Sequence, residues 1–372
     1  MGDMTVSKKG QLTLSFNWIF VMVAGAVILL FFVGLIVKQK DSSEQKLNFD
    51  VVNILESILV GSTVSEQTIN TIDTSGISSM ELFFECELDS DGGFLDVFAR
   101  YGITGTTASQ ELPIQVIMSP PKFSTKKLIL WSLPYEMPFK VTDILILTGQ
   151  SHQYYVFGSS SSVLGSELQN ATSSFNIDFV TSASEISSIG ANEHVRIIDL
   201  DGSYIAAGAP VPIELNSASD QDVSAVVLGI GGYDLYQKEG NVFAKVNRAG
   251  QIPIISLFNS DRDAAQISAL FSGSQENYQC NMMKVFKRME IIVDVYEGKA
   301  MQLANFYESP ENYDSECLLL YDDVAGELNP LGVQITSCVA RGYEDCLNIE
   351  EYSRRLLELN DELDNAGCIE LY

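Results

Sequence analysis

The feature that most constrains this chain is an uncharged, apolar stretch near its N-terminus, FNWIFVMVAGAVILLFFVGLIV, which runs from Phe16 to Val37. Its only strongly polar side chain is Asn17. At about 1.5 Å per residue, a helix of this length crosses a hydrocarbon core about 30 Å thick. No other uncharged segment of the 372 residues is as continuously apolar over this length. The sequence therefore predicts one transmembrane helix over 16–37, preceded by a short cytoplasmic tail or signal over 1–15.

A cleaved secretory signal is the alternative interpretation of this stretch. The stretch exceeds the roughly 7–15 apolar residues of such signals. Its one small-x-small triplet, Ala24-Gly25-Ala26, lies in the middle of the run and not at the far end, where a cleavage site would be. We therefore favour a permanent anchor.

Beyond the apolar stretch, an amphipathic helix is expected over 38–61. Apolar side chains recur there at three- and four-residue spacing, namely Leu47, Val51, Ile54, Leu55, Ile58 and Leu59. Neither Pro nor Gly interrupts the chain from Leu35 to Val60. One continuous helix from Phe16 to Val60 would be about 68 Å long. An anchor alone does not need such a rod, whereas helices that pack side by side in a filament do.

The residues just before the apolar stretch, Lys8-Lys9-Gly10-Gln11, resemble the class III signal of archaeal type IV pilin-like proteins. The resemblance covers about the first 60 residues and implies cleavage between Gly10 and Gln11. It also implies a structural role in the cell envelope, with further copies of the chain or other filament proteins as partners. The family usually carries Glu at the fifth mature position, where this chain has Ser15.

The remainder of the chain is strongly acidic. Beyond residue 50 it carries 17 basic and 45 acidic groups, a net charge of −28. Such a surface repels phosphate backbones and anionic lipids, so we expect no nucleic-acid partner and a body that stands off the bilayer. A solvated acidic coat explains this composition most simply. A salt-adapted host or divalent-cation binding would also fit it.

The cysteines favour disulfides over a metal site. The six are Cys86, Cys280, Cys317, Cys338, Cys346 and Cys368. None shows Cys-x-x-Cys spacing, and the only histidines, His152 and His194, lie far from them in sequence. We predict a bridge between Cys280 and Cys317 and one more among the last three cysteines, with the pairing otherwise open. Each histidine is interpreted as a hydrogen-bonded surface or core side chain.

The side of the membrane is inferred from weaker signals. Disulfides require an oxidising compartment, and the sequon Asn170-Ala171-Thr172 fits a glycosylated surface there. Two lysines precede the span and three follow it within ten residues, so lysine counting does not decide the orientation. We predict a single-pass protein of the cell membrane with an extracytoplasmic C-terminal body. A cytoplasmic body also agrees with the lysine count.

The body divides into a linker and three parts, and the overall class is α+β. Residues 62–79 are rich in Ser, Thr and Gly and predict a linker. Strand-like runs over 80–140 predict a small antiparallel β module. Alternating strands and helices over 141–260 predict a doubly wound α/β domain. Residues 261–372 form a helical region that holds five of the six cysteines.

Signatures of common catalytic sites are absent from the sequence. It contains no Gly-x-Ser-x-Gly, His-Glu-x-x-His or phosphate-loop motif, so we name no catalytic residue and expect a protein that is not an enzyme. The run from Gly229 to Gly232 is interpreted as a turn between strands, because its glycine spacing is wrong for a dinucleotide site.

Two Asp-x-Asp-Gly runs are the remaining candidates for a ligand or metal site. They contain Asp89 and Asp91, and Asp199 and Asp201. Both lack the closing Glu of a calcium loop, and ordinary turn chemistry explains them, so Ca²⁺ is the only cofactor considered. Asp199 and Asp201 end a predicted parallel strand, where open α/β sheets bind ligands. The alternative to the pilin-like role is therefore a membrane-tethered α/β ligand-binding module, or a degenerate enzyme, with carboxylates at this edge.

Overall fold

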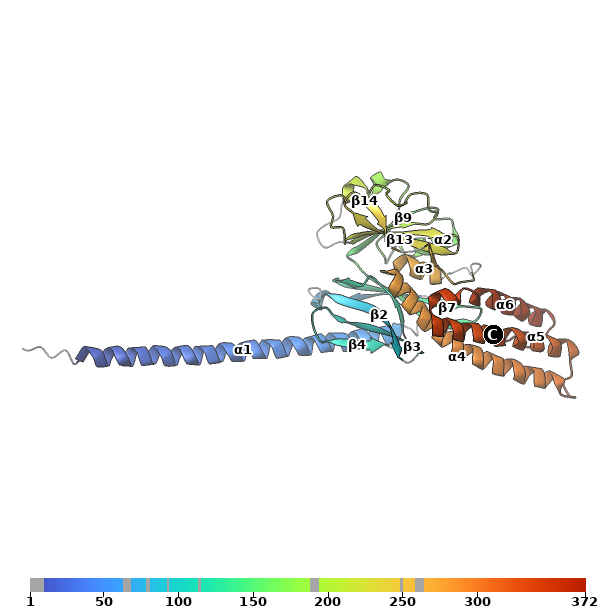
Figure 1. Ribbon diagram of the computed structural model, residues 1–372, viewed down its shortest axis with the longest axis horizontal. Helices are drawn as coiled ribbons and strands as arrows, with labels where there is room; N and C mark the ends of the chain where they lie inside the picture. The colour runs from blue at the N-terminus through green and yellow to red at the C-terminus, as the bar shows by residue number, and fades with distance from the viewer. Residues whose placement is uncertain are drawn as a thin grey trace, which may run out of the picture.

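A computed structural model describes residues 10–62, 68–77, 81–91, 94–112, 115–187, 194–247, 250–257 and 264–372. One helix, α1 (Gly10–Ser62), projects from a head that contains three β-sheets and the remaining helices (Figure 1). The predicted α+β class and the long N-terminal apolar helix are both confirmed. The helix begins six residues before the predicted apolar stretch; it contains no Pro, and Gly25 and Gly34 do not interrupt it.

Two four-stranded sheets enclose the second half of α1. The first sheet has the order β1-β7-β8-β5 and the second has the order β4-β3-β2-β6. The strands of the first sheet are β1 (Ile69–Asp73), β5 (Val116–Met118), β7 (Lys127–Glu136) and β8 (Lys140–Gly149). Those of the second sheet are β2 (Leu82–Asp91), β3 (Phe94–Ile103), β4 (Ser109–Leu112) and β6 (Lys122–Phe123).

The small core between these sheets contains side chains of α1. Val52, Leu55 and Leu59 pack with Leu130 of β7 and Phe84 of β2, and all five are at least 96 % buried. Burying several large apolar side chains in this way stabilises the head by roughly 1.5–3 kcal/mol for each. The head therefore includes the second half of α1 as a structural element.

The strand β8 corrects one boundary of the sequence analysis. It starts the segment assigned to the α/β domain, yet it pairs antiparallel with β7 along a hairpin from Leu128↔Gly149 to Glu136↔Lys140. The predicted β module therefore extends through Gly149, and its first sheet is mixed, because β5 pairs parallel with β8. Local apolar spacing identifies a strand but not its partner, since a buried strand looks the same in either sheet.

A seven-stranded third sheet follows. Its strands are β9 (His152–Phe157), β10 (Ile177–Phe179), β11 (His194–Asp199), β12 (Val223–Gly229), β13 (Gly232–Glu239), β14 (Val242–Lys245) and β15 (Ile252–Pro253). The four strands β10-β9-β11-β12 are parallel, whereas β13, β14 and β15 join antiparallel. Helix α2 (Val163–Ala171) connects β9 to β10. The finer prediction of a doubly wound arrangement stays a prediction.

The turn from β12 to β13 confirms the interpretation of the Gly229–Gly232 run. These two glycines face each other across the hairpin, and Gly231 between them has a φ of 74°. Only glycine adopts this left-handed backbone without strain, which is why a glycine-rich turn is used here.

The C-terminal region is helical, as predicted, and shares one large core with the first and third sheets. Its helices are α3 (Ala264–Phe271), α4 (Gln275–Glu308), α5 (Ser315–Arg341) and α6 (Ile349–Asn365). The short 3-10 helices are η1 (Ser75–Ile77), η2 (Ala183–Glu185), η3 (Ile213–Leu215) and η4 (Tyr343–Cys346). Ser274 caps the N-terminus of α4, and its hydroxyl accepts a hydrogen bond from the Asn277 amide.

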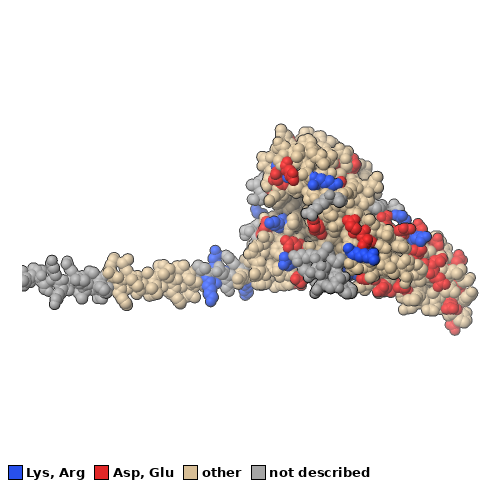
Figure 2. Space-filling view, viewed as in Figure 1, with Lys and Arg blue, Asp and Glu red and all other residues tan. Residues whose placement is uncertain are grey.

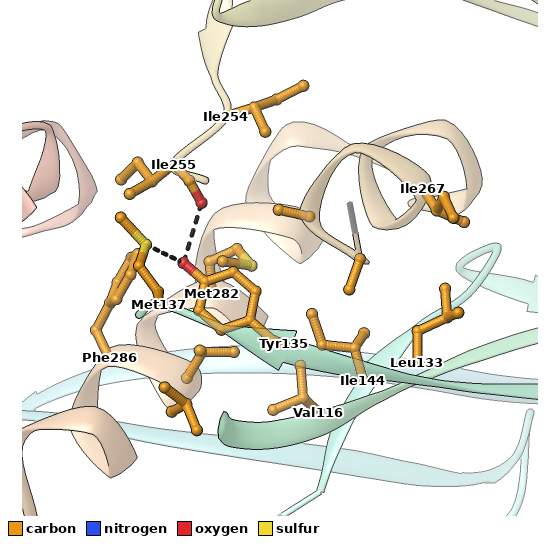
Figure 3. Close-up of a cluster of buried hydrophobic side chains, with 14 of the residues drawn as sticks. Val116, Leu133, Tyr135, Met137, Ile144, Ile254, Ile255, Ile267, Met282 and Phe286 are labelled. Atoms are coloured by element: carbon orange, nitrogen blue, oxygen red, sulfur yellow. Dashed lines mark hydrogen bonds between the residues drawn. The ribbon is translucent and has the colours of Figure 1, made fainter. Parts of the chain in front are cut away.

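Tyr135 of β7 shows how the large core is joined. It lies among buried side chains of the first sheet, α3 and α4, and its hydroxyl donates to the Ile255 carbonyl at 3.0 Å (Figure 3). A buried Tyr hydroxyl needs such a partner, so this bond fixes the segment after β15 against β7.

All six cysteines form disulfides, but the predicted Cys280–Cys317 bridge is wrong. The bridges are Cys86–Cys280, Cys317–Cys368 and Cys338–Cys346. Cys280 lies in the second turn of α4, and Cys317 lies in the first turn of α5, beyond the other end of α4. At about 1.5 Å per residue these positions are about 40 Å apart, so Cys280 instead reaches Cys86 of β2.

Candidate functional site

The candidate functional site is the first half of α1, because its apolar surface is uncovered. The large apolar side chains from Trp18 to Ile36 are exposed, among them Trp18 at 68 %, Phe20 at 73 % and Ile36 at 65 %. The most apolar 18-residue window has a mean hydropathy of 3.0, and none of it is buried. Water-soluble proteins rarely expose a continuous apolar surface of this extent. Within the described ranges, α1 is the one helix long and apolar enough to cross a membrane, a property that signal sequences share.

The second half of α1 differs because one side of it lies inside the head. Asn48, Val52, Leu55 and Leu59 face the small core, whereas Ile54 on the opposite side is 59 % exposed. The Tyr101 hydroxyl of β3 donates to the Val52 carbonyl at 3.3 Å. The uncovered half is thus continuous with a helix that the head holds firmly.

Charge is distributed unevenly along the molecule. Lys38, Lys40 and Lys46 are exposed on α1, between the apolar half and the head, and Figure 2 shows basic side chains on this part of the rod. Acidic side chains spread over the part of the head formed by α4, α5 and α6 (Figure 2). Lysines next to an apolar helix are suited to lipid headgroups, and an acidic surface is suited to solvent.

The proposed processing junction lies at the end of the rod that is far from the head. Gly10 is the first residue of α1 and Gln11 follows it in the first turn. Lys8 and Lys9 fall outside the described residues. The backbone of the junction is therefore helical on its Gln11 side, and nothing in the head lies near it (Figure 1).

Asp199 ends β11 as predicted, but its carboxylate is already occupied by the backbone. One oxygen accepts from the Gly202 amide at 3.0 Å, and the other accepts from the amides of Tyr204 and Ile205 at 2.8 and 2.7 Å. The side chain is fully buried. Three amide donors leave little capacity for a ligand, so Asp199 shapes the loop that follows β11.

Asp201 has a similar, smaller role on the surface. Its carboxylate accepts from the Ser203 amide at 3.0 Å, and hydrogen bonds from Ser203 hold the pKa of Asp201 below its usual value. This is ordinary turn chemistry. In the part of the chain that the structure describes, no group of three or more His, Cys, Asp or Glu could hold a metal ion.

The other sequence candidates do not converge with Asp199. Asp89 and Asp91 lie in β2, opposite Asp96 and Phe94 of β3, and their side chains fall outside the described residues. Asn170 is exposed in the last turn of α2, on the third sheet. The Asp89–Asp91 pair, the Asp199–Asp201 pair and Asn170 thus lie in different parts of the head and do not form one site.

His152, His194 and Arg196 form a partly buried polar cluster that the sequence did not predict. His152 and His194 pair across β9 and β11 and stack with ring centroids 4.8 Å apart. Burial, together with nearby His194 and Arg196, lowers the pKa of His152 to about 3. Arg196 is 92 % buried and donates to the Ser272 carbonyl at 2.6 Å. Each histidine is the first residue of its strand, but the sequence does not reveal the register of the two strands, so their contact could not be predicted.

Comparison of this chain with known protein families, curated proteins and solved structures found no match in any of the three. Its function therefore has to be argued from the geometry of α1 and of the head.

Proposed function

We propose that this chain is a single-pass membrane protein of the cell envelope, with a pilin-like structural or interaction role and an extracytoplasmic body. The observation that carries the proposal is that the two halves of the uninterrupted helix α1 have different surroundings. Its first half is apolar and uncovered, and its second half is part of the core of the head. Lipid is the medium that an uncovered apolar helix of this length requires.

The pilin-like role rests on three features that agree. The Gly10–Gln11 junction resembles a class III signal, the rod extends from it without interruption, and residues 38–61 act as an amphipathic helix that joins rod to head. A simple anchor would tolerate a flexible connection, whereas a rod fixed in the head transmits its position to the head. Partners are the bilayer and, by the resemblance, further copies of the chain or other envelope proteins.

The extracytoplasmic location is supported by the disulfides. All six cysteines are paired, and such bridges persist in oxidising compartments. The ligand-binding alternative has less support, since the Asp199 carboxylate at the edge of the third sheet already accepts three amides. A doubly wound domain with a site at that edge belongs to this weaker alternative.

Processing tests the pilin-like part of the proposal. Mass spectrometry of the protein extracted from membranes should find a mature terminus at Gln11, and Gly10→Val should abolish that cleavage. Gly25→Val is the matched control, because an added side chain at Gly25 meets no atom within 4 Å. A terminus at Met1 or Gly2 in the unaltered protein would reduce the chain to a simple anchor.

Protease treatment of intact cells tests the location. We expect an external protease to degrade the head and to leave a fragment that contains the apolar half of α1. Full protection of the head in intact cells, together with its degradation after lysis, would place the body in the cytoplasm. Free thiols at all six cysteines in freshly alkylated cells would argue for the same conclusion.

A further inference from the structure

A pocket of about 360 Å³ lies where the start of β8 meets the middle of α4. This volume is in the range of small-molecule sites. The polar side chains that line it are Gln115, Lys140, Thr142, Asp143 and Arg288, with Ile292 as part of an apolar wall. The lining includes neither Asp199 nor any residue of α1, and the roles proposed above do not use this pocket.

Asp143 brings a carboxylate with one unmet oxygen to this pocket. Its Oδ2 lies 3.1 Å from the Lys140 ammonium, and its side chain is only 10 % exposed. Its Oδ1 is buried and has no hydrogen-bond partner among the described residues. Leaving a buried acceptor unpaired is unfavourable, so a rotation of the carboxylate that turns Oδ1 toward a donor in the pocket would be stabilising.

Arg288 adds a positive charge to the lining of the pocket. It projects from α4, and its guanidinium reaches the Thr142 hydroxyl over a long 3.4 Å contact. Within the described ranges it forms no ion pair, although a guanidinium is suited to hold a carboxylate by two parallel hydrogen bonds. The lining has one positive charge in excess, in a chain whose net charge is −27.

Lys284, one turn before Arg288 on α4, lies behind Gln115 of the lining. Its ammonium donates to the Gln115 carbonyl at 2.9 Å, and the residue is only 5 % exposed. Burial lowers the pKa of Lys284 to about 7. This depression reflects the poor solvation of Lys284 itself behind Gln115.

We propose that this pocket binds a small zwitterion of the α-amino acid class, with its carboxylate on Arg288 and its ammonium on Asp143. An anion alone would leave Asp143 Oδ1 unpaired and bring a like charge beside it. A cation alone would add to the positive excess of the lining. A ligand with both groups on one carbon supplies the acceptor and the donor together, and its side chain lies toward Ile292.

Binding can be measured by calorimetry on the detergent-solubilised full chain, at constant ionic strength, with each of the common amino acids in turn. The amino acid with the strongest binding is then compared with its two analogues, the carboxylic acid without the amino group and the amine without the carboxylate. We expect both analogues to bind at least about tenfold more weakly, because each leaves one charged partner unpaired.

Variants of the two partners complete the test. Arg288→Met and Asp143→Asn should each weaken binding by at least about tenfold, whereas Lys287→Met, which removes an exposed charge from the same helix outside the lining, should not change it. If Asp143→Asn fails to fold, Arg288→Lys replaces it in the test. This variant keeps the positive charge but loses the two parallel hydrogen bonds of a guanidinium, so it should weaken binding by a smaller factor than Arg288→Met.

Three results would overturn the proposal: no amino acid binds saturably at millimolar concentration, the analogue without an amino group binds as well as the amino acid, or Arg288→Met binds normally. The membrane role would stand in each case, since it depends on α1 and not on this pocket.

Discussion

Acid should destabilise the head through His152, and replacing this residue should remove that effect. The imidazole is 7 % exposed, packs edge-on against Phe123 and stacks on His194, with Arg196 as a further charge nearby. Because burial lowers the pKa of His152 to about 3, the ring stays neutral in the folded protein throughout the mildly acidic range. In the unfolded chain the same ring binds a proton below about pH 6.5.

The sign and size of the effect follow from this difference. Between pH 6.5 and about pH 3 the unfolded state binds more protons than the folded state, so the free energy of unfolding falls as the pH falls. The loss is about 1.4 kcal/mol for each pH unit below 6.5, or about 2 kcal/mol at pH 5. Below about pH 3 both states are protonated and the loss from His152 stops growing.

His152→Phe keeps an aromatic ring beside Phe123 but removes the titration. The assay is denaturant unfolding followed by the fluorescence of Trp131, which is 96 % buried between the sheets and α3, in a Trp18→Phe background that silences the other tryptophan. The stability of the variant relative to the parent should rise by about 2 kcal/mol between pH 7 and pH 5. Carboxylate titration is common to both proteins and cancels. A difference in stability that does not change with pH would refute the buried, neutral histidine.

Two further predictions concern the joins between α1, the second sheet and α4. Leu55→Ala should destabilise the head by about 2–5 kcal/mol, because Leu55 is 98 % buried in the small core. Ile54→Ala, on the exposed side of α1, should change the stability by less than about 0.5 kcal/mol. Equal effects of the two substitutions in denaturant unfolding would show that α1 is not packed as described. Replacing Cys86 and Cys280 by Ser should lower the unfolding free energy by up to about 5 kcal/mol, since their bridge spans 194 residues. Peptide mapping without reduction should find these two cysteines joined in the parent protein. A joined Cys280–Cys317 peptide would instead contradict the fold at α4.

The features that were predicted best from the sequence are those that depend only on residues close together in the chain. The apolar stretch and the spacing of Val51, Leu55 and Leu59 are local patterns, and the observed α1 contains both in one helix. Strand-like runs and the glycine turn between β12 and β13 were also readable, because alternation and turn chemistry act over a few residues. The overall α+β class follows from such local patterns.

What the sequence did not reveal depends on partners distant in the chain. The pairing of Cys280 with Cys86 depends on which end of α4 meets β2, and the stacking of His152 on His194 depends on the register of two parallel strands. Asp199 was placed correctly at the end of β11, yet the loop after it supplies three amides that no spacing rule predicts. Asp143 and Arg288 line one pocket only because β8 lies against α4.

In the proposed arrangement, the same helix that enters the bilayer also fixes the height of the head above it. The apolar stretch ends at Val37, and among the side chains that the structure describes after it, the first buried one is Asn48, so about 16 Å of helix separates the hydrocarbon from the core of the head. Lys38, Lys40 and Lys46 are exposed within this interval, at the depth of lipid headgroups, whereas the acidic body begins beyond it. Because α1 is uninterrupted through Ser62, the head cannot pivot toward the membrane without bending this helix or losing Val52, Leu55 and Leu59 from its core. Contacts between neighbouring copies would then be limited to heads held at one common height, a restriction that a flexible tether would not impose.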